Sequence, residues 1–586
     1  MNGPAAGRRT KVVLLPSPTR DGDLPQVHLP LGLLSLATVL NRTDSFAASI
    51  FDLNRRSGFG DVSGIAREIL DLDPDVLGFS GLCSGYPLSL RLAARCKELR
   101  PELKVLFGGP QSTVCAESTA CHCPQVDLVV RGECDRTIVP ILASLDDAAE
   151  LAAQPGVTFR TGGRLVSTPP AELVTDLDSL PLPDYSLFPD YRRLPAIPVE
   201  VSRGCPFGCR FCCVPAISGR HFRTCSPERI VGLLSRLYSP PFGRRFVLIQ
   251  DTFNLNREWV FAFCRALRRT GLDISWATSI RIDRLDPEML SAMAEAGCSQ
   301  LFFGLESASP RLQAAMGKEI PSETVNRVLA EMTRLGIEPA ISHIIGFPDE
   351  TREEMYGTIR QATRFRYDFP ARHCSQLHLL APLAGSPLYG EFKGRLQFDG
   401  TYSNLAFGTL SREETALVRD HPDLFSAYYY YPLQHLSREE VTRAAYLFEV
   451  LFTMRYTCFW LWRDDAFRYP AGLLESGPTD ELPARQCRED SVAISDTETV
   501  IRFLQARYPR LAESRHPLLD VMNYDLAIQR ARTEGPRIQS FGCDVHRFAM
   551  RARREGFRAL HDPPSGPVTL LFTLSADIVE VRRLAK

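Results

Sequence analysis

Three cysteines spaced as CxxxCxxC are the residues of this 586-residue chain whose types and spacing most clearly carry chemistry. They stand in the segment CPFGCRFC at residues 205–212. Thiolates hold iron–sulfur clusters, one on each iron, so three thiolates in one short loop hold three irons of a cubane and leave the fourth open. Structural zinc instead requires four ligands, usually in paired units. We therefore predict that Cys205, Cys209 and Cys212 hold a 4Fe–4S cluster with one open iron.

The residues around this array fit that prediction. Gly204 and Gly208 allow the loop to wrap a cluster, because glycine tolerates unusual dihedral angles. Cys213 directly follows the array. Because adjacent residues point in different directions, we expect Cys213 to be buried rather than to serve as a fourth ligand. Three chance thiols in a chain with 17 cysteines are the alternative interpretation.

The array, with the aromatic Phe211 before its last cysteine, resembles that of the radical S-adenosylmethionine (radical SAM) superfamily. In that superfamily the open iron chelates the amino and carboxylate groups of SAM, which the reduced cluster cleaves to a 5′-deoxyadenosyl radical. The resemblance covers roughly residues 195–390 and includes five further segments: Gln250-Asp251-Thr252-Phe253, Trp276 to Arg281, Gly304-Leu305-Glu306-Ser307, Gly346 to Thr351, and Pro382 to Tyr389, with Ser386 where relatives carry Thr. It implies that Asp251, Arg281, Glu306 and Ser307 lie near SAM. Each segment alone also has a purely structural interpretation, as a turn or a strand-end carboxylate.

The elements that must position these residues form two alternations of strands and helices. The first occupies residues 1–150, with helical spacing in Pro30–Asn41, Gly64–Leu72 and Leu88–Leu99 between short apolar strands. The expected strands are Lys11–Leu15, Ala48–Asp52, Val76–Ser80, Lys104–Phe107 and Asp127–Val130. Such alternation predicts βαβ units and a parallel sheet, which binds ligands at the carboxyl ends of its strands. No GxGxxG sequence occurs, so a dinucleotide is not indicated.

Placed before a radical SAM core, residues 1–150 resemble the cobalamin-binding domain of the cobalamin-dependent radical SAM enzymes. The resemblance rests on Pro30-Leu31-Gly32-Leu33 and on small-residue loops at strand ends. It implies cobalamin contacts from Ser80, Gly81, Leu82, Gly108, Gly109, Pro110, Gln111, Gly132 and Glu133. The alternative for each glycine pair is a tight turn between strand and helix.

One departure from many cobalamin enzymes is the absence of a DxHxxG loop, whose His binds cobalt from below. His28 is preceded by Gln26 rather than Asp, and His122 lies in Cys121-His122-Cys123. The resemblance then implies cobalamin without a His ligand on cobalt, its lower face met by residues 81–86. We expect Cys115, Cys121 and Cys123 to be core or loop residues, although a metal group is the alternative.

The second alternation predicts a partial (β/α)6 TIM barrel in residues 196–393, after a Gly- and Pro-rich connector at 151–195. Its expected strands are Pro198–Ser202, Arg245–Gln250, Ile274–Thr278, Gln300–Leu305, Ala340–Ile345 and Gln376–Leu380. Residues 394–586 predict a mostly helical C-terminal substrate or capping domain, with a small hairpin at Pro567–Phe572 and Ile578–Val581. The fold class is thus α/β: a Rossmann-like doubly wound cobalamin-binding domain, a radical SAM barrel and this C-terminal part.

Charge and hydropathy exclude several classes of partner. Lys and Arg number 68 against 69 Asp and Glu, so no basic field exists to hold nucleic acid. No run of 18 apolar residues occurs: the most apolar stretch, Tyr446–Leu461, contains Glu449 and Arg455, so we expect no membrane span. The four apolar residues Val12–Leu15 are too few for a secretory signal, and we expect a cytoplasmic protein.

The function that this resemblance implies is methylation of an unactivated carbon, or a similar centre, in a natural-product intermediate or peptide. One SAM would methylate cobalt and another would supply the radical, with electrons from an external flavodoxin- or ferredoxin-type donor. A non-methylating cyclase or oxidoreductase and a polar, tryptophan-type C-methylase are the alternatives. A cobalamin- or redox-sensing module is a third, against which the complete CxxxCxxC argues. Tyr428–Tyr431, Tyr456, Phe459, Trp460 and Trp462 either line a substrate cavity or pack in a helical core. The substrate's identity and the oligomeric state do not follow from the sequence.

Overall fold

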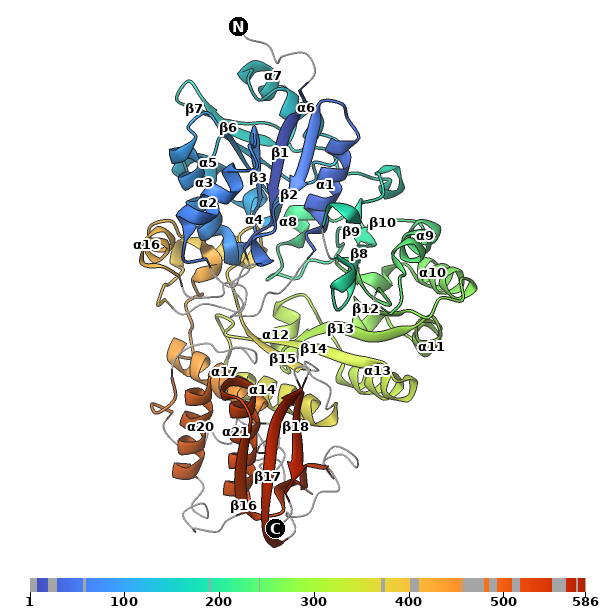
Figure 1. The fold of residues 1–586 in the computed structure, drawn as a ribbon, viewed down its shortest axis with the longest axis vertical. Coiled ribbons are helices and arrows are strands. Elements are labelled where there is room, and N and C mark those ends of the chain that lie inside the picture. Colours follow the sequence, from blue (N-terminus) through green and yellow to red (C-terminus); the bar gives the residue numbers. More distant parts are fainter. Residues whose placement is uncertain are drawn as a thin grey trace. The chain divides into compact units, whose positions relative to one another are not determined.

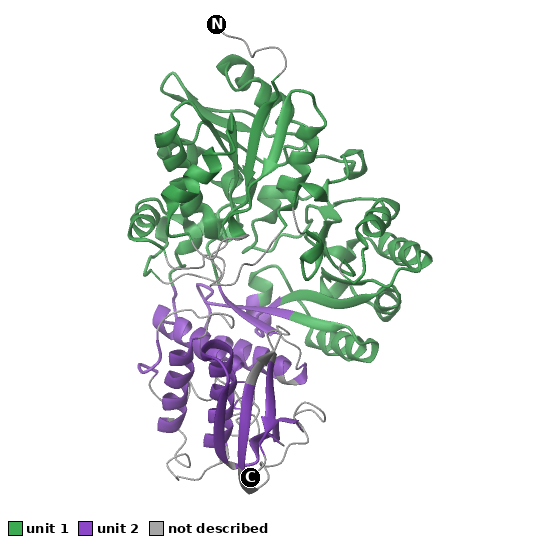
Figure 2. Cartoon of the chain, in the orientation of Figure 1, with its two compact units in different colours: residues 1–304, 313–340, 380–432 green, residues 305–312, 341–379, 433–586 purple. Residues whose placement is uncertain are grey.

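The computed structural model of the chain contains two compact units, which are drawn in different colours in Figure 2. The first comprises residues 1–304, 313–340 and 380–432, and the second residues 305–312, 341–379 and 433–586. The structure describes residues 8–18, 29–55, 59–188, 191–241, 243–369, 375–400, 410–454, 457, 479–483, 493–507, 517–546, 548–550, 565–575 and 578–584.

A seven-stranded sheet with the order β2-β1-β3-β4-β5-β6-β7 forms the amino-terminal part of the first unit (Figure 1). Its strands are β1 (Thr10–Leu15), β2 (Phe46–Ile50), β3 (Val76–Ser80), β4 (Lys104–Gly108), β5 (Leu128–Val130), β6 (Val157–Thr161) and β7 (Arg164–Ser167). The first five strands pair in parallel, which confirms the predicted parallel sheet. The hairpin β6–β7 adds antiparallel strands to it, within residues that we expected to be connector.

Helices cover both faces of this sheet, as its alternating side chains require. Val12 and Leu14 of β1 pack into a core with Leu33 and Ile141, whereas Val13 and Leu15 face the opposite way. Successive side chains of a strand point to opposite faces, so a strand apolar throughout needs cover on both. The helices are α1 (Leu31–Asn41), α2 (Val62–Leu70), α3 (Tyr86–Leu99), α4 (Gly109–Val114), α5 (Ala116–His122), α6 (Ile138–Ala143) and α7 (Ala148–Ala152). The doubly wound prediction is confirmed.

A second strand–helix alternation follows. Its strands are β8 (Ile197–Glu200), β11 (Arg245–Ile249), β12 (Ser275–Ser279), β13 (Cys298–Glu306), β14 (Glu338–Ile345) and β15 (Ser375–Leu379). Strands β8, β11, β12 and β13 pair in parallel in that order, and β14 pairs in parallel with β15. The intervening helices are α8 (Val214–Ser218), α9 (Pro227–Leu237), α10 (Arg257–Arg269), α11 (Pro287–Glu295), α12 (Pro310–Ala315), α13 (Ser322–Leu335) and α14 (Arg352–Asp368). These six strands match the six predicted from the sequence to within a few residues.

The remaining residues divide between the two units. Helices α15 (Pro387–Phe392) and α16 (Arg412–Asp420) belong to the first unit. The second contains α17 (Arg438–Thr453), α20 (Ile494–Arg507), α21 (Pro517–Glu534) and the antiparallel strands β16 (Arg537–Cys543), β17 (Ser565–Ser575) and β18 (Ile578–Arg583). Strands β17 and β18 form the predicted hairpin, and β16 pairs with β17. Among the described residues, no helix has both the length and the apolar character needed to cross a membrane.

Candidate functional site

The three cysteines of the CxxxCxxC array lie in one loop that begins at Gly204, directly after the short strand β9 (Ser202–Arg203). The backbone N–H of Cys205 donates to the carbonyl of Gly219, 3.3 Å away, and that of Cys212 donates to the carbonyl of Cys209 at 3.0 Å. Arg210, between them, donates to the carbonyl of Met316 and accepts from the N–H of Leu388. The loop is therefore fixed at both ends and in its middle by backbone hydrogen bonds.

Gly204 precedes the first cysteine in a conformation that other residues rarely adopt. Its φ is +83°, and a Cβ atom there would lie 2.3 Å from the carbonyl oxygen of His221. The Oδ2 atom of Asp251 accepts a hydrogen bond from the Gly204 N–H at 2.9 Å. Burial raises the pKa of Asp251, and this N–H bond opposes the rise. Asp251, predicted to contact SAM, thus also positions the entrance of the cysteine loop.

The side chain of Arg281, a second predicted SAM contact, lies over the cysteine loop. Its guanidinium stands 3.9 Å from the ring centroid of Phe207, a cation–π distance. Two hydrogen bonds of 3.0 and 3.1 Å join the same guanidinium to Asp283. Asn254 binds the backbone N–H and carbonyl of Arg281 through its own amide. Arg281 is therefore held against the loop by partners that the sequence analysis did not identify.

The donor set fits an iron–sulfur cluster. Burial, with a smaller contribution from the neighbouring thiols of Cys213, Cys209 and Cys205, raises the pKa of Cys212 to about 12. The neighbouring thiols disfavour ionisation of a free Cys212, whereas metal binding requires deprotonated sulfur, so this environment suits Cys212 as a metal ligand better than as a free thiolate. Cys213, which we expected to be buried, is half-buried at the start of α8.

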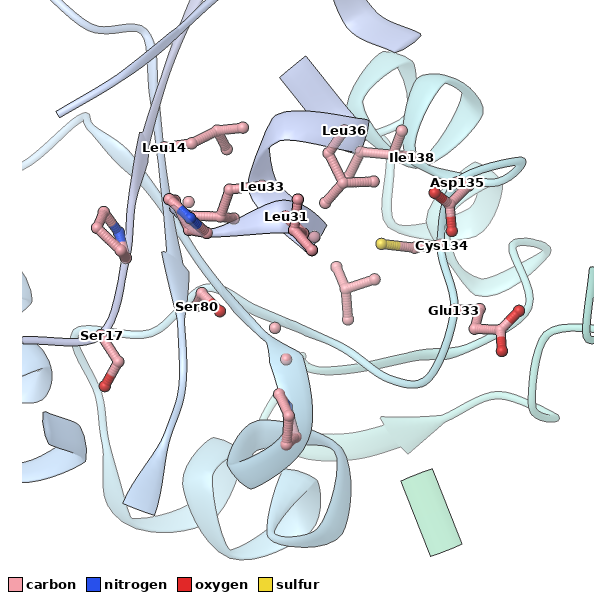
Figure 3. Close-up of a pocket in the computed structure, with 18 of the residues that line it drawn as sticks. Leu14, Ser17, Leu31, Leu33, Leu36, Ser80, Glu133, Cys134, Asp135 and Ile138 are labelled. Carbon is pink, nitrogen blue, oxygen red and sulfur yellow. The ribbon is translucent and has the colours of Figure 1, made fainter. Parts of the chain in front are cut away.

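A cavity of 560 Å³ opens at the carboxyl end of the first sheet (Figure 3). Its deep part is apolar and includes Leu14, Leu33 and Leu36. Another part of its wall comes from residues in and just after the strands next to the cysteine loop: Glu200, Ser202, Arg203, Ile249, Gln250 and Asp251. One side chain, Asp251, therefore both lines the cavity and binds the backbone of Gly204.

Glycines form the rim where the strands of the first sheet end. Gly109 has φ +85°, and a Cβ atom there would lie 2.9 Å from Ser80 Oγ. Gly132 has φ +72° and open space where its Cβ would be. The cavity is lined by these residues of the rim, for which we predicted cobalamin contacts: Ser80, Leu82, Gly108, Gly109, Pro110, Gly132 and Glu133. A wide glycine rim above an apolar slot fits a large, amide-rich cofactor with a tail.

Two predicted cofactor contacts, Gly81 and Gln111, are not among the residues that line this cavity. Gly81 exchanges backbone hydrogen bonds with Gly108 and Gln111. The amide of Gln111 is buried and donates to the carbonyl of Leu424 at 2.7 Å. Gly81 and Gln111 therefore support the residues of the cavity rim without lining the cavity themselves.

A buried network of charges joins the cavity to the strand that leads into the cysteine loop. Arg203 binds Asp135 at 2.7 and 3.3 Å and binds both oxygens of Glu200 at 2.9 Å. Glu133, a predicted cofactor contact, pairs with Arg223 at 2.6 Å and with Arg203 at 3.4 Å. Although burial alone would raise the pKa of Asp135, Arg203 holds it below its usual value. Arg203 follows the predicted strand Pro198–Ser202 and directly precedes Gly204, and the sequence analysis did not identify it as a site residue.

The second unit contains the other two predicted SAM contacts. Glu306, at the carboxyl end of β13, is buried and has φ +65°, a strained value for a residue with a side chain. Ser307 is fully buried, and its hydroxyl lies 3.1 Å from that of Thr358. Such strain at a strand end is typical of functional positions.

Glu350 is a further buried carboxylate in the second unit, within the segment Gly346 to Thr351 that contributed to the resemblance. Its Oε2 accepts from the N–H groups of Gly346 at 2.6 Å and Phe347 at 3.2 Å. Burial raises the pKa of Glu350 to about 8. The Gly-Phe-Pro turn after β14 is thus closed by its own glutamate.

Of the aromatic residues predicted to line a cavity or a helical core, Tyr456, Phe459, Trp460 and Trp462 lie outside the described residues, as does His28. Tyr428, Tyr429 and Tyr431 are buried. The Tyr428 hydroxyl donates to the carbonyl of Ser84 at 2.7 Å. These tyrosines therefore pack as core residues of the first unit.

Comparisons with known proteins agree with this geometry. Residues 199–362 match the model of the Radical SAM superfamily and residues 21–142 that of the B12 binding domain. An uncharacterised methyltransferase of Pyrococcus horikoshii is 33% identical over 365 residues, 61% of this chain and 77% of that protein. The anaerobic magnesium-protoporphyrin IX monomethyl ester cyclase of Cereibacter sphaeroides is 25% identical over 61% of this chain, which spans only 59% of the cyclase. The solved structure of the cobalamin-dependent S-adenosylmethionine radical enzyme OxsB, with aqua-cobalamin and S-adenosylmethionine bound, has a TM-score of 0.60 at 15% identity, over 89% of this chain and 84% of that one.

Proposed function

Because the chain belongs to the cobalamin-dependent radical SAM enzymes, we propose that it is a methyltransferase that methylates a carbon, or a similar centre, lacking a nucleophilic lone pair. The observation that carries this proposal is the cavity, which the glycine rim of the first sheet and the strands beside the cysteine loop line together. Bound there, the cofactors of this family supply a methyl group and a carbon-centred radical. The 33% identity to a protein described as a methyltransferase supports the same reaction class.

We assign the cofactor contacts as follows. Cys205, Cys209 and Cys212 hold the 4Fe–4S cluster, because they lie in one loop fixed by backbone hydrogen bonds and the other two thiols are electrostatic neighbours of Cys212. Gly108, Gly109 and Gly132 allow cobalamin to approach the backbone, and the slot around Leu14 and Leu33 receives its tail. Asp251, Arg281, Glu306 and Ser307 are the SAM-site residues in this proposal. Asp251 and Arg281 act there at least partly by positioning Gly204 and Phe207.

A non-methylating cyclase is the second candidate, because the chain is 25% identical to an anaerobic cyclase over 370 residues. A polar tryptophan-type C-methylase is the third. In all three, we propose a small-molecule or peptide substrate, an external flavodoxin- or ferredoxin-type electron donor and a cytoplasmic location.

The test needs no knowledge of the final substrate. Reconstituted protein with cobalamin is reduced and incubated anaerobically with SAM carrying a deuterated methyl group. A methyltransferase, radical or polar, transfers the label to bound cobalamin and releases S-adenosylhomocysteine, whereas a cyclase that uses SAM only as a radical source does neither. Absence of label on cobalamin, with the cluster and cobalamin present, rejects the proposal.

Two glycine variants test whether cobalamin binds at the cavity rim: Gly109→Ala is the test and Gly271→Ala is its control. Gly109→Ala places a Cβ 2.9 Å from Ser80 Oγ at the cavity rim, so we expect loss of cobalamin and of label transfer with the cluster retained. Gly271→Ala introduces a similar positive-φ strain, at +66°, where the Cβ meets open space. It should retain both cofactors.

A further inference from the structure

Two histidines and an aspartate converge outside the cavity and the cysteine loop. They are His122, His421 and Asp423, and one potential ligand atom from each lies within 4.8 Å of the others. His122 is the last residue of α5, and His421 follows the last residue of α16. Segments far apart in the sequence thus meet on the first unit, where α16 packs beside α3 (Figure 1).

Ser118 holds two of the three side chains in place, those of His122 and Asp423. The Nδ1 atom of His122 lies 3.1 Å from the carbonyl oxygen of Ser118. A carbonyl can only accept, so Nδ1 carries the proton and Nε2 keeps its lone pair. Metal-binding histidines commonly have such a partner on the second nitrogen. The hydroxyl of Ser118 also binds Oδ2 of Asp423, which fixes the carboxylate.

The local charge favours a cation. The C-terminal ends of α5 and α16 both lie here, and the last carbonyls of a helix carry partial negative charge. The carboxylate of Asp423 adds a full negative charge. The rings of His122 and His421 lie 4.7 Å apart between centroids, so both can turn a nitrogen toward one point. His122 is exposed and the other two are half-buried, which gives an ion access from solvent.

We propose that His122, His421 and Asp423 bind one divalent transition-metal ion of the zinc class. Imidazole nitrogens select zinc and its neighbours over magnesium and calcium, which prefer oxygen ligands. A tetrahedral ion with bonds of about 2.0–2.1 Å places its ligands roughly 3.4 Å apart, within reach of small side-chain rotations here. Water takes the fourth position. The site is separate from the thiolates of the cysteine loop and does not depend on the proposed function.

The ion ties residues 421–428, which we call the strap, to the first sheet domain. Gln111 donates to the carbonyl of Leu424 at 2.7 Å, and Tyr428 donates to that of Ser84 at 2.7 Å. Leu424 is fully buried against the same domain. Gln111 lies in α4, directly after β4, and Ser84 lies in the 3-10 turn Cys83–Gly85 after β3. The metal therefore anchors one end of a segment that packs behind the cavity rim.

The experiment uses tag-free protein with its cluster reconstituted, so that the three cysteines are occupied. Zinc is titrated by equilibrium dialysis, and X-ray absorption at the zinc edge identifies the ligands. We expect one zinc per chain with a nitrogen and oxygen shell at about 2.0–2.1 Å. Two variants, His421→Phe and Asp423→Asn, should each weaken zinc binding at least about 100-fold, because each removes a direct ligand. The phenylalanine keeps an aromatic ring beside His122. His435→Phe, an exposed histidine of the second unit, should bind zinc like the wild type.

Hydrogen exchange gives a readout that is independent of affinity. Zinc should slow amide exchange in residues 421–428 of the wild type and of His435→Phe. It should not change the exchange of these residues in His421→Phe or Asp423→Asn. A zinc shell with sulfur at about 2.3 Å overturns the proposal, since the ion then lies on thiolates. The proposal is also overturned if the wild type binds zinc no more tightly than His421→Phe and Asp423→Asn do. It is overturned as well if zinc does not slow amide exchange in the strap.

Discussion

Replacing Arg203 by methionine tests whether the buried charge network holds the cavity and the cysteine loop together. Arg203 has only 11% of its side chain exposed and is shared by Asp135, Glu200 and Glu133. Methionine keeps much of the side-chain length but leaves Asp135, itself 7% exposed, without its cation. Removing one partner of a buried ion pair costs about 3–5 kcal/mol, because the other charge stays buried and uncompensated.

This cost should appear as faster local opening. At about 1.4 kcal/mol per factor of ten, 3–5 kcal/mol corresponds to an increase in amide exchange of roughly two to four powers of ten. The peptides to follow cover residues 132–136 and 197–203, since a chain with several domains does not unfold in one step. The double variant Arg203→Met/Asp135→Asn should be less destabilised than the sum of its single variants, because it no longer buries the orphan carboxylate.

The matched control is Arg268→Met. Arg268 pairs with Glu295 at 2.5 Å, but both side chains are 55% exposed. Exposed pairs contribute at most about 1 kcal/mol, so we expect less than a fivefold change near α10. If exchange in Arg203→Met also changes less than fivefold, or if the double variant loses the full sum, the network does not stabilise this wall of the cavity.

Three further predictions follow from the site. The triple variant of Cys205, Cys209 and Cys212 to Ala should lose its 4Fe–4S cluster in iron and sulfide analysis, and full retention would contradict the assignment. Electron paramagnetic resonance of cobalt(II) cobalamin in the protein should show no nitrogen superhyperfine splitting, since the chain lacks DxHxxG; such splitting would reveal an axial imidazole or benzimidazole. Burial raises the pKa of Glu350 from 4.5 in the unfolded chain to about 8, so its ionisation opposes folding. This penalty is absent below about pH 4.5, grows as the pH rises and levels off above 8, at roughly 4–5 kcal/mol. Thermal unfolding should therefore show Glu350→Gln gaining stability over the wild type across that window, and a pH-independent difference would refute the buried-acid assignment.

The features that the sequence predicted well are those encoded locally. The strand after Lys11 and the strand from Val76 to Ser80 were found from short apolar runs, and the cysteine array from its spacing alone. The hairpin β6–β7 also had a local signal, the Gly162-Gly163 turn between alternating residues, which we assigned to a connector.

The features that escaped prediction depend on contacts between distant segments. Nothing near Glu133 in the sequence shows that its carboxylate pairs with Arg223, and nothing near Gln111 shows that it binds the carbonyl of Leu424. The resemblance implied that both contact cobalamin; Glu133 lines the cavity while it pairs with Arg223, and Gln111 does not line the cavity. The positive φ of Glu306 likewise arises from tertiary packing, since no glycine stands there to indicate it.

The double contact of Asp251 has a consequence for how the protein acquires its cofactors. Because this carboxylate lines the cavity and also holds Gly204 at the mouth of the cysteine loop, ordering either place lowers the entropic cost of ordering the other. Thermodynamic linkage makes such help reciprocal. We therefore expect maturation to be cooperative: protein already loaded with cobalamin should take up iron and sulfide more completely, and cluster-loaded protein should bind cobalamin more tightly. Partly loaded molecules would then be scarce in a cell with limited cobalamin.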